Sequence, residues 1–166
     1  MYIYDIINSK ILQKNQQKKE ILSINFVDSF VLTGGEESMI KLWDTKTNKI
    51  EKYIYPFEGK VTDRIQENNE TNSNWISTIN FDSNKNYFVC GGGSTFSTIW
   101  NLSSLTIASI LPTSSNTNDS IFIDDKILTV GNEKFIYFWE KNGKFSNRID
   151  SGLTEIYSIS SIQKDV

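Results

Sequence analysis

The chain has 166 residues, of which 38% are hydrophobic and 22% are charged, and its formal net charge is −3. This composition fits one soluble globular domain or part of a repeat array. The sequence contains no apolar run of about 18 residues, so no membrane-spanning helix is expected. The N-terminal stretch also lacks the basic start and long apolar core of a signal peptide. The mildly acidic charge argues against a surface that grips nucleic acid as a whole.

Histidine is absent, and Cys90 is the single cysteine. The absence of histidine removes the commonest general base, the commonest zinc ligand and any Ser-His-Asp triad. One cysteine excludes an internal disulfide and fits a reducing compartment. We therefore expect no catalytic residue, no metal site and no cofactor.

The chain opens in the middle of a repeating unit. Residues 1–11 (MYIYDIINSKI) align without gaps on residues 40–50 (IKLWDTKTNKI), which places Tyr4 where Trp43 stands. Alternating apolar and polar side chains then predict four short strands over 21–26, 30–33, 39–43 and 50–55. Residues 20–55 are therefore expected to form the first complete four-stranded unit.

Residues 56–74 interrupt this pattern with proline, glycine and many polar residues, which predicts a long mobile loop. A second unit follows over 75–111, and a third runs over 120–149 after a polar connection. Residues 122–131 (FIDDKILTVG) align without gaps on residues 26–35 (FVDSFVLTGG). Residues 155–160 (EIYSIS) match residues 20–25 (EILSIN), which predicts that a strand begins a further, partial unit over 155–166.

The units close on aromatic residues whose spacings along the chain are 39, 57 and 39 residues. The long interval contains the 56–74 insertion, and the other two are close to the WD40 period of about 40–45 residues. Residues 33–44, with a glycine turn, an Ile-Lys-Leu strand and a closing Trp-Asp, resemble the end of a WD40 repeat. The resemblance covers nearly the whole chain and assigns WD-type structural positions to Tyr4, Asp5, Gly34, Gly35, Trp43, Asp44, Gly91, Gly92, Trp100, Asn101, Gly131, Trp139 and Glu140.

The WD40 resemblance implies an all-β propeller. The strand inventory predicts a partial one, with about three complete four-stranded blades and parts of flanking blades at 1–14 and 155–166. Because propellers are closed rings of about four to eight blades, we expect the later half of a larger propeller or a truncated gene product. A four-bladed ring that closes imperfectly is the alternative.

The polar tetrad of WD40 blades contains a histidine, so that tetrad cannot form in this chain. The positions at the turn tips carry Glu37, Ser94 and Glu133 instead. We therefore expect apolar packing and buried tryptophan side chains, more than a polar network, to hold the blades together.

Trp75 is the candidate partner-contact residue, because it begins an innermost strand beside the long loop and is expected to be partly exposed near the channel mouth. Cys90 is expected to be a buried small hydrophobe, because no histidine activates it. The glycines at 91–93 precede a strand and no helix, which predicts a turn and argues against a phosphate cradle. Asp28 and Asp124 are expected at hairpin tips, where aspartate favours turns.

A second resemblance lies between Trp75 and Trp139. A Trp-Ile pair (75–76), a Cys-Gly-Gly-Gly turn (90–93) and a Phe-x-x-Asp-x-Ile-Leu segment (122–128) resemble the C-terminal half of the THO complex subunit 6 family. That resemblance implies a non-enzymatic scaffold in a THO/TREX-like complex that acts in mRNA processing and nuclear mRNA export. It implies other THO/TREX subunits as partners, indirect contact with RNA, a nuclear location, and no membrane or small-molecule substrate. A generic WD40 adaptor, such as a ubiquitin-ligase substrate receptor, is the alternative.

Overall fold

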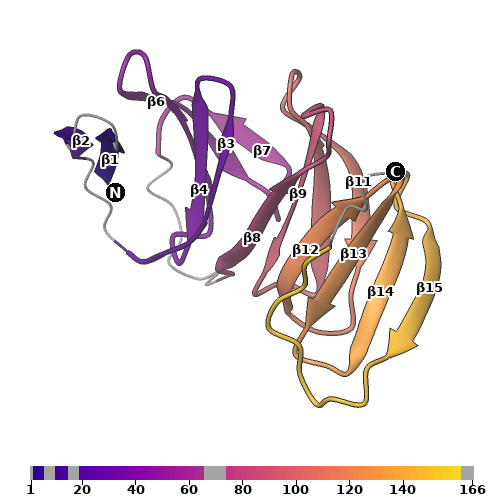
Figure 1. Cartoon of the computed structure of the whole chain (residues 1–166). Helices are drawn as coiled ribbons and strands as arrows, with labels where there is room; N and C mark the ends of the chain where they lie inside the picture. Colours follow the sequence, from indigo (N-terminus) through magenta and orange to yellow (C-terminus); the bar gives the residue numbers. More distant parts are fainter. Residues whose placement is uncertain (1, 6–9, 15–18, 66–73, 162–166) are drawn as a thin grey trace, which may run out of the picture.

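A computed structural model describes residues 2–5, 10–14, 19–65 and 74–161, and every regular element within these ranges is a strand (Figure 1). The strands form three antiparallel sheets of four or five strands and one separate pair. The sheets follow one another along the chain like the blades of a propeller (Figure 1). The prediction of an all-β fold with about three complete blades is confirmed.

The first blade has five strands, one more than predicted. They are β3 (Ile21–Val27), β4 (Phe30–Gly35), β5 (Ile40–Asp44), β6 (Lys49–Tyr55) and β7 (Lys60–Thr62). The interpretation of 56–74 as a loop throughout is therefore wrong, because β7 pairs with β6 from Tyr53↔Thr62 to Tyr55↔Lys60. Gly59 supplies the positive φ of 68° that the connecting turn requires, and Val61 packs against the core. Residues 66–73 of this stretch lie outside the described residues.

The second and third blades each have four strands. They are β8 (Ile76–Phe81), β9 (Tyr87–Gly92), β10 (Phe96–Asn101) and β11 (Thr106–Pro112), then β12 (Thr117–Ile123), β13 (Lys126–Gly131), β14 (Phe135–Glu140) and β15 (Phe145–Asp150). β12 begins three residues before the predicted start of the third blade at Ser120. The reason is that the buried Thr117 hydroxyl bonds Ser97 Oγ of the second blade at 2.9 Å, which draws this stretch into the blade contact.

The separate pair consists of β1 (Tyr2–Asp5) and β2 (Lys10–Lys14). Its register shifts between Ile3 and Tyr4. The same shift between the third and fourth strands occurs at the closing tryptophan of each complete blade, at Leu42/Trp43, Ile99/Trp100 and Phe138/Trp139. The backbone of β1 and β2 therefore matches the third and fourth strands of a blade, as the alignment of Tyr4 with Trp43 predicts.

Apolar side chains between successive blades form two core clusters. One joins the first two blades and includes Leu32 and Ile40 on one side and Ile79 and Trp100 on the other. The other joins the second and third blades and includes Val89, Ile99, Leu111, Ile127, Tyr137 and Trp139. The innermost strands β3, β8 and β12 lie side by side. The second and third blades thus each present their closing tryptophan to the blade before them.

The strand predicted over 155–160 is not formed, and residues 151–161 contain no assigned strand. This stretch is held against β12 and β13 by isolated hydrogen bonds, such as Ile156 N–H to the Gly131 carbonyl at 2.9 Å. The reason is that a β-strand requires a ladder partner, and none of the strands described in this structure pairs with it.

Candidate functional site

The closing tryptophans lie on the third strand of each complete blade and are almost fully buried. Trp43, Trp100 and Trp139 are 6%, 0% and 3% exposed. Each indole N–H donates to a threonine hydroxyl of its own blade at 2.9 Å. Burying an indole is favourable only when its N–H finds an acceptor. The Trp–Thr pairs meet that requirement in all three blades.

The second blade achieves the same pairing by a different route. In the first and third blades the acceptor is Thr33 or Thr129 on the second strand. Cys90 occupies that position in the second blade, and Trp100 donates to Thr98 on its own strand instead. The Cys90 thiol lies 3.2 Å from the same Thr98 hydroxyl, and burial raises its pKa to about 12. A thiol with such a high pKa is inert, as a structural cysteine should be.

Polar contacts also form at the turn tips, beside the apolar packing and the buried tryptophans on which the blades are expected to depend. In the first blade Glu37 forms an ion pair with the buried Lys41. In the third blade the Tyr137 hydroxyl donates to Glu133 at 2.8 Å, and Ser114 and Ser115 donate to the same carboxylate at 2.8 and 2.9 Å. Serine hydroxyls of the loop between blades thus supply donors that this chain cannot take from histidine.

The residue after each closing aromatic follows one of two patterns. The Asp44 carboxylate accepts the Lys46 N–H at 2.8 Å and the Thr47 hydroxyl at 2.9 Å, and the backbone bond lowers the pKa of this carboxyl. Asn101 accepts the Ser104 N–H at 3.0 Å in the same kind of turn. Glu140 instead uses its backbone, with its carbonyl accepting the Gly143 N–H at 2.9 Å. For Tyr4 and Asp5 the structure describes the backbone of β1 and not the side chains.

A glycine at the end of each second strand allows the chain that enters the blade to pass at close range. A Cβ on Gly35 or Gly92 would lie 2.0 Å from the Glu20 carbonyl oxygen or 1.8 Å from that of Trp75. A Cβ on Gly131 would likewise lie 1.9 Å from the Asn116 carbonyl oxygen. No real Cβ contact is that short, so these positions require glycine. Gly34 and Gly91 precede them and face the next blade. A Cβ on Gly34 would contact Ile76 of the second blade, and a Cβ on Gly91 would contact Thr117 of the third blade as well as Ser97 of its own blade.

Trp75 is half-buried at the junction of the first two blades. Gly93 lies against its ring, because a Cβ on Gly93 would lie 2.8 Å from Trp75 Cε3, and the Gly93 N–H donates to the Trp75 carbonyl at 2.9 Å. An open cavity of about 510 Å³ is lined by Trp75 together with Lys19, Leu22 and Glu36. The indole is therefore held on one side and available on the other, next to both a positive and a negative side chain.

Among the residues that the structure describes, no group of three or more acidic or cysteine side chains is placed to hold a metal ion. The described residues also include no helix that is long and apolar enough to cross a membrane. Asp28 and Asp124 lie at hairpin tips with φ of 51° and 52°, a left-handed conformation typical of turn residues.

Two features of the site escaped the sequence analysis. The Trp–Thr pairs had a signal, since a threonine precedes the closing tryptophan by ten residues in both the first and the third blades. The second feature is Asp82, for which the sequence signal was weaker: an aspartate that directly follows β8. It is buried and accepts the Asn86 and Tyr87 N–H groups at 2.8 and 2.9 Å, which fixes the turn to β9.

The fold places the chain in the class of WD40-repeat β-propeller proteins. The WD40 repeats of RRP9 align with a TM-score of 0.68 at 10% identity, over 82% of this chain and 40% of that one. Sqt1 from Saccharomyces cerevisiae aligns with a TM-score of 0.76 at 9% identity, over 98% and 46%. The computationally designed Ika4 protein aligns with a TM-score of 0.72 at 14% identity, over 91% of this chain and 85% of that one. At these identities the likeness shows the fold alone.

Within that class the chain is similar to THO complex subunit 6, which confirms the resemblance seen in the sequence. It is 29% identical to the Arabidopsis thaliana subunit over 132 residues, 80% of this chain and 33% of the relative. Identity is 29% over 130 residues to the human subunit and 30% over 115 residues to the Danio rerio homolog. These alignments cover 78% and 69% of this chain, and 36% and 33% of the relatives.

The chain thus spans about a third of the length of the curated relatives it matches. Models of known protein families give no match to it.

Proposed function

We propose that the chain is a non-enzymatic WD40 scaffold, and that it serves as a subunit of a THO/TREX-like complex in mRNA processing and nuclear mRNA export. The observation that carries the proposal is the similarity to relatives named THO complex subunit 6 from plants and vertebrates. The relatives' name states membership of a complex, which fits a protein that works by holding other subunits.

The geometry supports binding through rigidly placed surface groups. Each blade is fixed by a buried Trp–Thr pair and by an apolar cluster shared with its neighbour. The loops and turns at the ends of the blades therefore present their side chains on a stable frame, as binding loops on rigid scaffolds do. The partners we propose are other protein subunits, with RNA contacted through them, because the net charge of −3 does not favour direct phosphate binding.

Within this proposal Trp75 is a partner-contact residue. Its ring is pre-oriented by Gly93, so little side-chain entropy is lost when a partner covers the free side. Half-exposed tryptophans that are held in this way are frequent anchors in protein interfaces. Lys19 and Glu36 beside the ring add charged groups of both signs, which suits a protein surface better than a polyanion.

Affinity purification of the tagged protein from its own cells tests both parts of the proposal. We expect THO subunits among the main co-purifying chains and a nuclear location of the tagged protein. Trp75→Ala should reduce that recovery, whereas Ile110→Ala, which truncates an apolar side chain 51% exposed on β11, should not. Thermal unfolding of the variants shows whether each keeps its fold.

A cytoplasmic protein whose main partner is a cullin or a membrane coat would overturn the proposed function and favour a generic adaptor. If Trp75→Ala recovers THO subunits as well as the wild-type chain does, the role of Trp75 is refuted. The proposed scaffold function is not affected by that result.

A further inference from the structure

Equivalent residue pairs lie where the chain enters each of the three complete blades. In each pair, a backbone N–H of the turn after the second strand donates to the carbonyl of the residue that precedes the first strand. The pairs are Glu36 with Glu20 at 3.1 Å, Gly93 with Trp75 at 2.9 Å, and Asn132 with Asn116 at 3.2 Å. The blades therefore present different side chains at one shared position, two carboxylates in the first blade and an indole over a glycine in the second.

The pair in the second blade leaves one face of the indole uncovered. A Cβ on Gly93 would lie 2.8 Å from Trp75 Cε3 and 3.0 Å from both Cδ2 and Cζ3, the two ring atoms bonded to Cε3. Nearly equal distances to three bonded ring atoms place Gly93 over the face of the indole and not at its edge. The opposite face is left to the open cavity of about 510 Å³ that Trp75 lines.

The pair in the first blade places two carboxylates beside that cavity. Glu36 lines the cavity, and Glu20 is joined to it by the backbone hydrogen bond. Both residues are exposed, and no other described residue forms a hydrogen bond or an ion pair with either carboxylate. Lys19 also lines the cavity, so one ammonium group faces two carboxylates and the site keeps one negative charge. Like charges at paired positions destabilise a sheet, and a cation from a partner would remove that cost.

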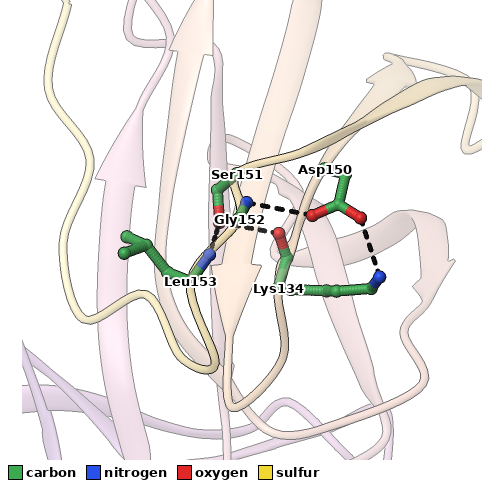
Figure 2. A network of polar contacts seen from close by, with 5 residues as sticks. All are labelled: Lys134, Asp150, Ser151, Gly152 and Leu153. Atoms are coloured by element: carbon green, nitrogen blue, oxygen red, sulfur yellow. Dashed lines mark hydrogen bonds and ion pairs between the residues drawn. The ribbon is translucent and has the colours of Figure 1, made fainter.

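Figure 2 shows how a carboxylate of the third blade is neutralised in the same kind of position. Asp150 Oδ2 lies 2.7 Å from Nζ of Lys134, in the turn between β13 and β14, and the other carboxylate oxygen accepts the Gly152 N–H at 2.9 Å. Glu20 and Glu36 have no such cation among the described residues other than the single Lys19 beside the cavity. The negative charge next to Trp75 is therefore available to a partner.

We propose that this site, the Trp75 site (Lys19, Glu20, Leu22, Glu36 and Trp75), binds an arginine side chain that a partner protein presents. The inference rests on the proposed role of Trp75 as a partner contact and names the group that it contacts. The guanidinium stacks on the uncovered face of the indole, the aromatic ring that attracts cations best. Its planar fork of N–H groups donates to the Glu36 carboxylate. The methylenes of the arginine pack on Leu22, which is 47% exposed.

Arginine fits the Trp75 site better than the other groups that stack on tryptophan. A nucleobase brings a phosphate backbone, which the net negative charge of the site repels. An apolar side chain would cover the Glu36 carboxylate without giving it a partner. A lysine ammonium has the charge but lacks the planar group that stacks on an indole. The cavity also has room for residues that flank the arginine, since ligand pockets measure about 300–1,000 Å³.

A fluorescently labelled peptide with one arginine between glycine and serine residues tests the proposal. Its anisotropy is followed as the whole chain is added, and the same peptide with citrulline in place of arginine serves as the neutral isostere. We expect saturable binding of the arginine peptide, about tenfold tighter than that of the citrulline peptide, because citrulline loses the cation–π contact and the ion pair. Unlabelled arginine peptide should also change the tryptophan emission of the chain, because Trp75 is half-buried and the other three tryptophans are at most 6% exposed.

Two variants locate the contact. Glu36→Gln removes the charge from an exposed position, and Trp75→Leu removes the indole while keeping an apolar side chain against Gly93. Each should weaken binding of the arginine peptide about fivefold or more. The matched control is Glu51→Gln, which makes the same change of charge at an exposed position on β6 of the first blade and should leave the affinity unchanged. Thermal unfolding shows whether each variant keeps its fold.

Equal affinity of the arginine and citrulline peptides, or equal effects of Glu36→Gln and Glu51→Gln, would overturn the proposal. A single-stranded RNA oligonucleotide that binds more tightly than the peptide, and more tightly still to Glu36→Gln, would overturn it in favour of a stacked base. Recovery of THO subunits with the tagged protein tests the proposed function separately. If that recovery depends on Trp75 but the arginine peptide does not bind, the partner contact stands and the arginine is refuted.

Discussion

Replacement of Trp139 by alanine should cause a large loss of stability. The side chain is 3% exposed, and its ring lies 5.8 Å from that of Tyr137 and 5.6 Å from that of Phe145. Truncating a buried tryptophan to alanine costs about 3–5 kcal/mol of unfolding free energy. The truncation also leaves the buried Thr129 hydroxyl without its indole donor, which places the loss toward the upper end of that range. For a domain of this size the midpoint of thermal unfolding should fall by about 6–20 °C.

Scanning calorimetry of the wild-type chain and the variant measures this loss. Trp75→Ala is the matched control, because it removes the same side chain from a half-buried position and should lower the midpoint much less. An unmoved midpoint for Trp139→Ala, or equal shifts for the two variants, would refute the assignment of Trp139 as the residue that closes the blade core.

Three further results follow from the structure. Gly92→Ala should destabilise the second blade strongly, because the added Cβ would lie 1.8 Å from the Trp75 carbonyl oxygen, whereas Gly152→Ala, with nothing within 4 Å of its Cβ, tests the effect of a positive φ alone. The Cys90 thiol should react with a thiol reagent only as fast as the chain unfolds, and rapid reaction in native buffer would contradict its burial. Acidification should destabilise the fold, because hydrogen bonds lower the pKa of Asp44, Asp63 and Asp150 below 3.8 in the folded state. Their contribution is present above pH 3.8 and is lost as the pH falls through the folded values, so a midpoint that stays constant from pH 5 to about pH 2.5 would contradict these contacts.

The repeat pattern predicted the blades because each blade is a local structure. Alternation of side chains over 30–33 and 39–43 decides which face of a strand is buried, and the neighbouring strands are joined by short turns. The closing tryptophans were found for the same reason, since each is the last apolar residue before a turn. The threonine partners in the first and third blades were missed because the pairing joins two strands, and composition alone gives no register.

The prediction of a strand over 155–160 was wrong for a related reason. Its sequence matches that of β3, and its hydrogen bonds to Asp119 place it as an inner strand, but strand formation depends on a neighbouring strand that the described residues do not provide. The contacts of Glu37 and Glu133 at the turn tips were equally hidden. Their partners, Lys41 and Tyr137, stand four residues further on, and a sequence read against the histidine-containing pattern gives no reason to pair them.

The most direct test of the proposed function is the distribution of polyadenylated RNA after depletion of the protein. In situ hybridisation with an oligo(dT) probe reports this distribution in intact cells, and re-expression of the wild-type chain provides the control. A scaffold in nuclear mRNA export predicts that polyadenylated RNA accumulates in nuclei after depletion and returns to the cytoplasm on re-expression. An unchanged distribution in cells verified to lack the protein would contradict a role in mRNA export.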